Sequence, residues 1–99
     1  AINEFKQAIR SDPKLAAAQF NLGVTLQAQG QLEAAIAAYR AAISIDPNNA
    51  EANYNLGIAL NKQGKAEAAM AAYKEAIRIN PDYASAYVKL GANLTNESR

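Results

Sequence analysis

The chain has 99 residues, of which 51% are hydrophobic, and its ten basic and nine acidic side chains leave a net charge of +1. This length suits one domain with a packed core, and the balanced charge indicates no nucleic acid partner. Cysteine and histidine are absent, so disulfides, zinc-thiolate sites and the commonest general base are excluded. We therefore expect no metal and no cofactor.

No apolar run approaches the roughly 20 residues that a membrane-spanning helix needs, and the first residues do not resemble a signal peptide. We expect a soluble protein in the cytoplasm that has no membrane partner. A leader or an anchor outside this stretch of sequence is left open.

The sequence is built from one repeated unit. Residues 16–49 agree without a gap with residues 50–83 at more than half of their positions, which is a shift of 34 residues. Residues 1–15 match the second half of this unit, and residues 84–99 match its first half. A match at one fixed period is typical of stacked repeats, so we expect residues 1–99 to form a single array.

Each unit is predicted to contain two helices, because its apolar residues recur at intervals of three and four. Leu22 and Leu26 belong to a stripe on the first helix, and Gly30 and Gly64 mark the turns, where a residue tolerant of positive φ is favoured. Asp-Pro or Asn-Pro pairs follow the second helices, and we expect them to begin the next helix as cap and first turn. The six expected helices span residues 1–11, 15–29, 31–45, 48–63, 65–79 and 82–96.

Glycine recurs inside the first helix of each unit, as Gly23, Gly57 and Gly91. Glycine costs about 1 kcal/mol relative to alanine in a helix interior, so a close approach between helices is the expected reason for it. Aromatic residues at one position of the second helices are expected to fill the adjacent space: Phe5, Tyr39 and Tyr73.

The unit resembles the tetratricopeptide repeat, or TPR, over almost the whole chain. The residues that carry the resemblance are Leu22, Gly23, Gly30, Ala35, Tyr39, Ala42 and Pro47, followed by Leu56, Gly57, Gly64, Ala69, Tyr73, Ala76 and Pro81. The large aromatic residue common three positions before the leucine is replaced by Gln19 and Asn53. The resemblance implies an all-α, right-handed superhelical solenoid of antiparallel helix pairs, in which the first helices line a concave groove that binds a peptide or protein segment.

Helical spacing places a set of residues on the face of each first helix that would line this groove. The candidate peptide-binding residues are Phe20, Asn21, Val24 and Gln27 in the first unit, Tyr54, Asn55, Ile58, Asn61 and Lys62 in the second, and Val88 and Lys89 in the third.

Two asparagines in this set occupy equivalent positions, where the carboxamide can both donate to and accept from the main chain of an extended peptide. Asn21 and Asn55 match the asparagine ladders of the superhelical repeats in O-linked N-acetylglucosamine transferases. A purely structural role, in which they bond a neighbouring helix or water, is the alternative. Lys62 and Lys89 favour an acidic or neutral ligand.

Some members of the family grip a C-terminal carboxylate with five polar residues on three first helices. Here that pattern matches at Asn55 and Lys89 but meets Phe20, Val24 and Ser85 at its other positions. We expect no such clamp.

Other classes of function are less well supported by the residues. Without histidine and cysteine no nucleophile and base pair forms a motif, so the chain is predicted not to be an enzyme. Self-assembly is the alternative function, because the array begins with a second helix and ends with a first helix, so both terminal helices would be uncapped. Their apolar residues are Ile2 and Phe5 at one end and Tyr87, Leu90 and Leu94 at the other.

Overall fold

The computed structural model describes residues 13–97, which form five helices. They are α2 (Pro13–Ala28), α3 (Leu32–Ile45), α4 (Ala50–Lys62), α5 (Ala66–Ile79) and α6 (Ala84–Glu97). No strand occurs among these residues, which confirms the all-α class. The expected helix over residues 1–11 lies outside the described part of the chain, and the handedness of the solenoid stays a prediction.

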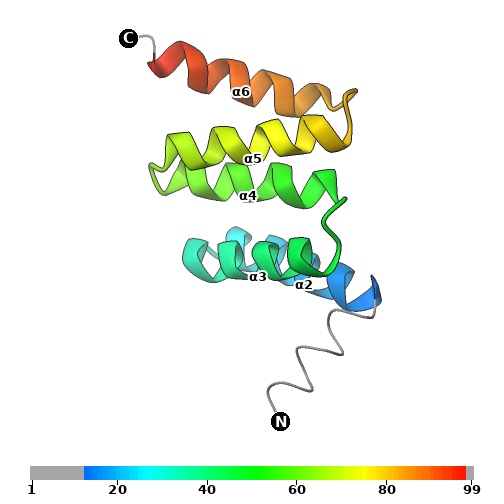
Figure 1. The fold of residues 1–99 in the computed structure, drawn as a ribbon. Coiled ribbons are helices and arrows are strands. Elements are labelled where there is room, and N and C mark those ends of the chain that lie inside the picture. The colour runs from blue at the N-terminus through cyan, green and yellow to red at the C-terminus, as the bar shows by residue number, and fades with distance from the viewer. Residues whose placement is uncertain (1–12, 98–99) are drawn as a thin grey trace. The chain divides into compact units, whose positions relative to one another are not determined.

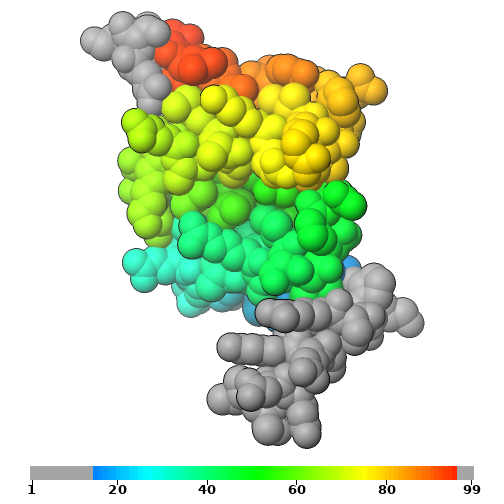
Figure 2. All heavy atoms as spheres, in the orientation of Figure 1, coloured from blue at the N-terminus to red at the C-terminus, as the bar shows by residue number. Residues whose placement is uncertain are grey.

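The chain divides into two compact units, residues 1–48 and 49–99. In the first unit α2 packs against α3, and in the second α5 packs against both α4 and α6 (Figure 1). The atoms of α5 and α6 also lie directly against one another in the space-filling view (Figure 2). Both α2–α3 and α4–α5 are helical hairpins, as short connections between consecutive helices predict.

The two hairpin turns confirm the prediction made from their glycines. Gly30 and Gly64 have φ values of 79° and 80°. The amide of Gln31 donates to the carbonyl of Leu26 at 2.9 Å, and that of Lys65 donates to Leu60 at the same distance. These bonds satisfy carbonyl groups that the end of a helix would otherwise leave unpaired.

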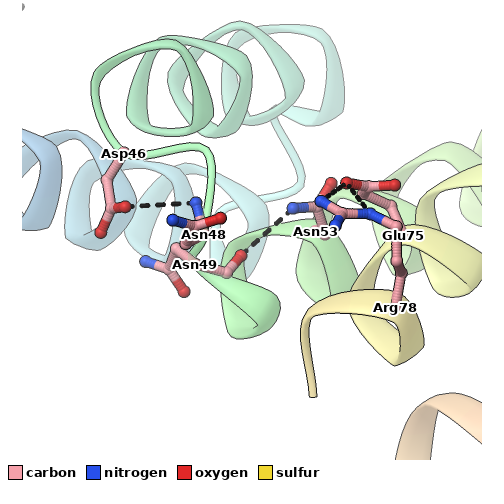
Figure 3. A network of polar contacts seen from close by, with 6 residues as sticks. All are labelled: Asp46, Asn48, Asn49, Asn53, Glu75 and Arg78. Carbon is pink, nitrogen blue, oxygen red and sulfur yellow. Dashed lines mark hydrogen bonds and ion pairs between the residues drawn. The ribbon is translucent and has the colours of Figure 1, made fainter. Parts of the chain in front are cut away.

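The Asp-Pro and Asn-Pro pairs act differently from the prediction at two of their three sites. Pro13 does begin α2, but Asp46 and Asn80 are the C-terminal caps of α3 and α5. The side chain of Asp46 accepts a hydrogen bond from the amide of Asn48 at 3.2 Å (Figure 3), so it stabilises the turn. Asn49 instead caps α4, because its side chain accepts from the amide of Ala52 at 3.0 Å.

Asn53, which replaces the common aromatic residue of the repeat, forms a hydrogen bond within its own helix. Asn53 is only 5% exposed, and its side chain donates to the carbonyl of Asn49 at 3.2 Å (Figure 3). The i to i−4 bond therefore satisfies an amide that burial would otherwise penalise. On the surface, Arg78 and Glu75 form an exposed ion pair one turn apart, which contributes little to stability.

Two of the three glycines inside first helices have the packing role that the sequence predicts. A Cβ atom at Gly23 would lie 2.6 Å from Cδ1 of Tyr39, and one at Gly57 would lie 2.7 Å from Cδ1 of Tyr73. Both tyrosines are fully buried. The prediction is wrong for Gly91, because nothing lies within 4 Å of its Cβ position. Phe5 lies outside the described residues.

The core of each hairpin consists mainly of alanine, with one tyrosine from the second helix. The buried residues of α3 are Ala35, Ile36, Ala38, Tyr39 and Ala42, and those of α5 are Ala69, Met70, Ala72, Tyr73 and Ala76. Small side chains let the two helices approach closely, so the tyrosine ring fills the remaining space. Leu22 remains 47% exposed, whereas the equivalent Leu56 of the second unit is buried.

Candidate functional site

The candidate groove residues differ in how much of each side chain reaches the surface. Val24 and Val88 are 43% and 69% exposed. Asn21, Lys62 and Lys89 are exposed as well, whereas the others are half-buried: Phe20, Gln27, Tyr54, Asn55, Ile58 and Asn61. All of them retain some accessible surface.

The aromatic members of the set also pack inside their own hairpins. The ring centroid of Phe20 lies 6.0 Å from that of Tyr39, and Tyr54 lies 5.9 Å from Tyr73, with nearly equal interplanar angles of 44° and 45°. Tyr54 additionally contacts Tyr83 at 5.1 Å. One face of each aromatic side chain is therefore used for packing, and the half-buried remainder is what a ligand could touch.

The two asparagines proposed to contact a peptide make no side-chain hydrogen bond to any described residue. Asn21 is exposed and Asn55 is half-buried, and they occupy equivalent positions on α2 and α4. The backbone carbonyl of Asn21 does accept a bond from the hydroxyl of Thr25 at 3.1 Å, but its carboxamide is left open to solvent. Within the described residues, neither carboxamide is thus committed to holding a neighbouring helix.

Gln27 and Asn61, also at equivalent positions, are engaged with other residues. The hydroxyl of Tyr39 donates to Oε1 of Gln27 at 2.7 Å. In the second unit, Asn61 instead uses its amide nitrogen to donate to Oδ1 of Asn93 at 2.9 Å, and the amide nitrogen of Asn93 reaches the carbonyl of Ala66 at 3.5 Å. These bonds connect α4, α5 and α6 at one end of the second unit.

Asn93 was missed by the sequence analysis, although it is only 4% exposed. The signal was present in the repeat alignment, because the equivalent position of the preceding unit carries Ala59, which is fully buried. A polar residue where another repeat buries alanine predicts a buried hydrogen bond, since an unpaired amide there would be costly.

The second unit contains a pocket with a volume of about 220 Å³. We call it the Tyr73 pocket. Its lining residues come from α4, α5 and α6: Ile58, Asn61, Lys62, Tyr73 and Lys89. Four of the five belong to the candidate peptide-binding set, so the fold brings them together around one open hollow.

The hydroxyl of Tyr73 is buried and has no hydrogen-bond partner. Burial is the main cause that raises the pKa of this tyrosine above its ordinary value, and the neighbouring Tyr54 acts in the same direction. Asn61 lies close enough to oppose that shift to a smaller extent, yet it forms no hydrogen bond with the hydroxyl. The group is therefore a protonated donor without an acceptor at neutral pH.

Residues 13–97 contain neither a membrane-spanning helix nor a cluster of metal-binding side chains. None of the helices is both long and apolar enough to cross a membrane. Nor do any three acidic side chains gather in this part of the chain in an arrangement that could hold a metal ion.

Repeated helical hairpins define a helical-repeat protein. A family model described as the TPR repeat matches residues 1–30, 27–64 and 59–95. The chain therefore belongs to the TPR family. A comparison with curated protein sequences finds no match.

Solved structures of TPR proteins are similar to this chain. The crystal structure of MamA has a TM-score of 0.84 and 30% identity, over 88% of this chain and 51% of that one. The first TPR of Spaghetti (RPAP3), bound to the HSP90 peptide SRMEEVD, has a TM-score of 0.80 and 27% identity, with 83% and 65% covered. YrrB, described as a TPR protein with an unusual peptide-binding site, has a TM-score of 0.71 and 32% identity, with 73% and 37% covered. The chain thus spans less than two thirds of each of these proteins.

Proposed function

We propose that the chain is a protein-interaction scaffold that binds a peptide or protein segment through the faces of its first helices. The observation that carries this proposal is the pair of uncommitted carboxamides, Asn21 on α2 and Asn55 on α4. The peptide bound to one similar TPR structure and the peptide-binding site of another support it. Binding rather than catalysis is the proposed role, and a cytoplasmic location stays a prediction.

The proposed contacts divide into polar and apolar groups. Each carboxamide offers a donor and an acceptor, which complement the amide and the carbonyl of an extended main chain. Apolar contact would come from the accessible parts of the neighbouring side chains: Phe20, Val24, Tyr54 and Ile58. Main-chain bonds supply affinity with little sequence preference, so the choice of ligand would depend on these flanking side chains.

The test uses peptides selected from a random library on the unaltered chain. Their affinity is then measured for an Asn21→Ala, Asn55→Ala double variant, and we expect a loss of about tenfold or more, since each lost hydrogen bond is worth roughly 0.5–1.5 kcal/mol. An Ala37→Ser, Ala71→Ser double variant is the control, because both positions are exposed and lie on second helices. Equal affinity of the Asn variant and the control, with unchanged helicity by circular dichroism, would refute the asparagine contacts.

Self-association is a second candidate function, and the surface of α6 favours it. Tyr87 and Leu94 on this helix are 51% and 48% exposed, and exposed apolar patches mark interaction surfaces. Ile2 and Phe5, the proposed counterpart, lie outside the described residues. In sedimentation experiments we expect the mass of the unaltered chain to rise with concentration. The Tyr87→Glu variant should remain a monomer, whereas the control variant Ser85→Glu should associate like the unaltered chain. A monomer at every concentration contradicts this candidate.

A further inference from the structure

The charged residues that line the Tyr73 pocket are all basic. Lys62 from α4 and Lys89 from α6 both line it, and no aspartate or glutamate does. Neither lysine forms an ion pair with any residue in the described range. Two ammonium groups beside one hollow repel each other, and an anion placed between them would be attracted to both.

The hydroxyl of Tyr73, one of the residues that line the pocket, has no hydrogen-bond partner. In the first unit the hydroxyl of Tyr39 is satisfied by Gln27. The residue equivalent to Gln27 in the second unit is Asn61, whose side chain is shorter by one methylene and whose amide is turned toward Asn93. The hydroxyl of Tyr73 is consequently left buried without a partner, which costs free energy that a bound acceptor would recover.

The size of the pocket suits more than a water molecule. Its volume of about 220 Å³ is several times the roughly 30 Å³ that one water occupies in the liquid. Ile58 provides apolar lining on one side, which fits the methylene part of a longer side chain. A carboxylate joined to a short aliphatic stem therefore matches the donors and the apolar lining.

We propose that the Tyr73 pocket takes the side-chain carboxylate of a glutamate or aspartate in the bound segment. The hydroxyl of Tyr73 donates to one carboxylate oxygen, and Lys62 and Lys89 neutralise its charge. This inference rests on the proposed peptide-binding function and adds the chemistry of one ligand position. The proposed site differs from the clamp for a C-terminal carboxylate. Only one of the five clamp positions, Lys89, lines this pocket.

The probe is glutamate blocked at both its amino and its carboxyl group, so that the side chain carries the only charge. Titrated into the ¹⁵N-labelled full chain, it is expected to shift the amide resonances of the last turn of α4 and of α6 around Lys89, with a dissociation constant of about 1 mM or weaker. Blocked glutamine, which has the same shape without the charge, is expected to cause no saturable shift in these residues.

Three variants connect this binding to the proposed groups. Tyr73→Phe is expected to weaken the binding of blocked glutamate by about tenfold, as the loss of a hydrogen bond to a charged group predicts. Lys62→Gln and Lys89→Gln should each weaken it several-fold, and added salt should reduce the effect. Tyr39→Phe is the matched control, because its hydroxyl is already bonded within the first unit.

Several results would overturn the inference. Equal shifts with blocked glutamate and glutamine, or an affinity for glutamate unchanged by Tyr73→Phe and Lys89→Gln, would show that the pocket holds water or an unselected side chain. If selected peptides still depend on Asn21 and Asn55 in that case, the proposed function stands and the pocket chemistry fails. If blocked glutamate binds as expected but the affinity for selected peptides does not depend on Asn21 and Asn55, the pocket chemistry stands and the proposed asparagine contacts fail.

Discussion

Replacing Gly57 with alanine is expected to lower the free energy of unfolding by about 2 kcal/mol, although alanine is the better helix former. The new Cβ atom would lie 2.7 Å from Cδ1 of Tyr73, well inside van der Waals contact. The ring is fully buried between helices, so moving it away from the new Cβ atom would disturb their packing. Urea denaturation followed by circular dichroism measures the change.

Gly91→Ala is the matched control for this prediction. Gly91 occupies the same position of the repeat on α6, and nothing lies within 4 Å of its Cβ position. Here the helix propensity of alanine acts alone, so the free energy of unfolding should rise by about 1 kcal/mol or slightly less. If Gly57→Ala and Gly91→Ala change stability in the same direction, close packing is not the reason for the glycine at Gly57.

Truncating Tyr73 to alanine is expected to have the largest effect of any single substitution in the second unit, about 3–5 kcal/mol. Tyr73 and Tyr39 are the largest fully buried side chains among the described residues. Their neighbours are mainly alanines on tightly packed helices, which cannot collapse into the space left behind. Since small domains are stable by only about 5–15 kcal/mol, the variant should lose much of its resistance to urea and heat.

Phenylalanine variants separate the ring of each tyrosine from its hydroxyl. Tyr39→Phe breaks the 2.7 Å hydrogen bond to Gln27 and should cost about 1 kcal/mol. Tyr73→Phe removes a buried hydroxyl that has no partner, so its free energy of unfolding should be unchanged or slightly higher. A greater loss for Tyr73→Phe than for Tyr39→Phe would mean that this hydroxyl is satisfied in solution.

The candidate site could be predicted from the sequence in part. Helical spacing placed Ile58, Asn61, Lys62 and Lys89 in one set of surface residues, and the structure brings these four together around the Tyr73 pocket. Their role in binding stays a prediction. The sequence assigned Tyr73 only to the core, because the position of a second-helix side chain at the floor of a surface pocket depends on how three helices pack.

The sequence by itself determined the local architecture. This comprises the repeat and its helices, the positive φ of Gly30 and Gly64, and the contact of Gly57 with Tyr73. These features depend on neighbours in the sequence and on periodicity, which a repeat displays more than once. Only the tertiary structure decided that Asn61 pairs with Asn93 while the hydroxyl of Tyr73 stays unpaired. The lengths of Gln27 and Asn61 differ by one methylene, and whether a side chain of either length reaches its partner depends on distances between helices that no pattern specifies.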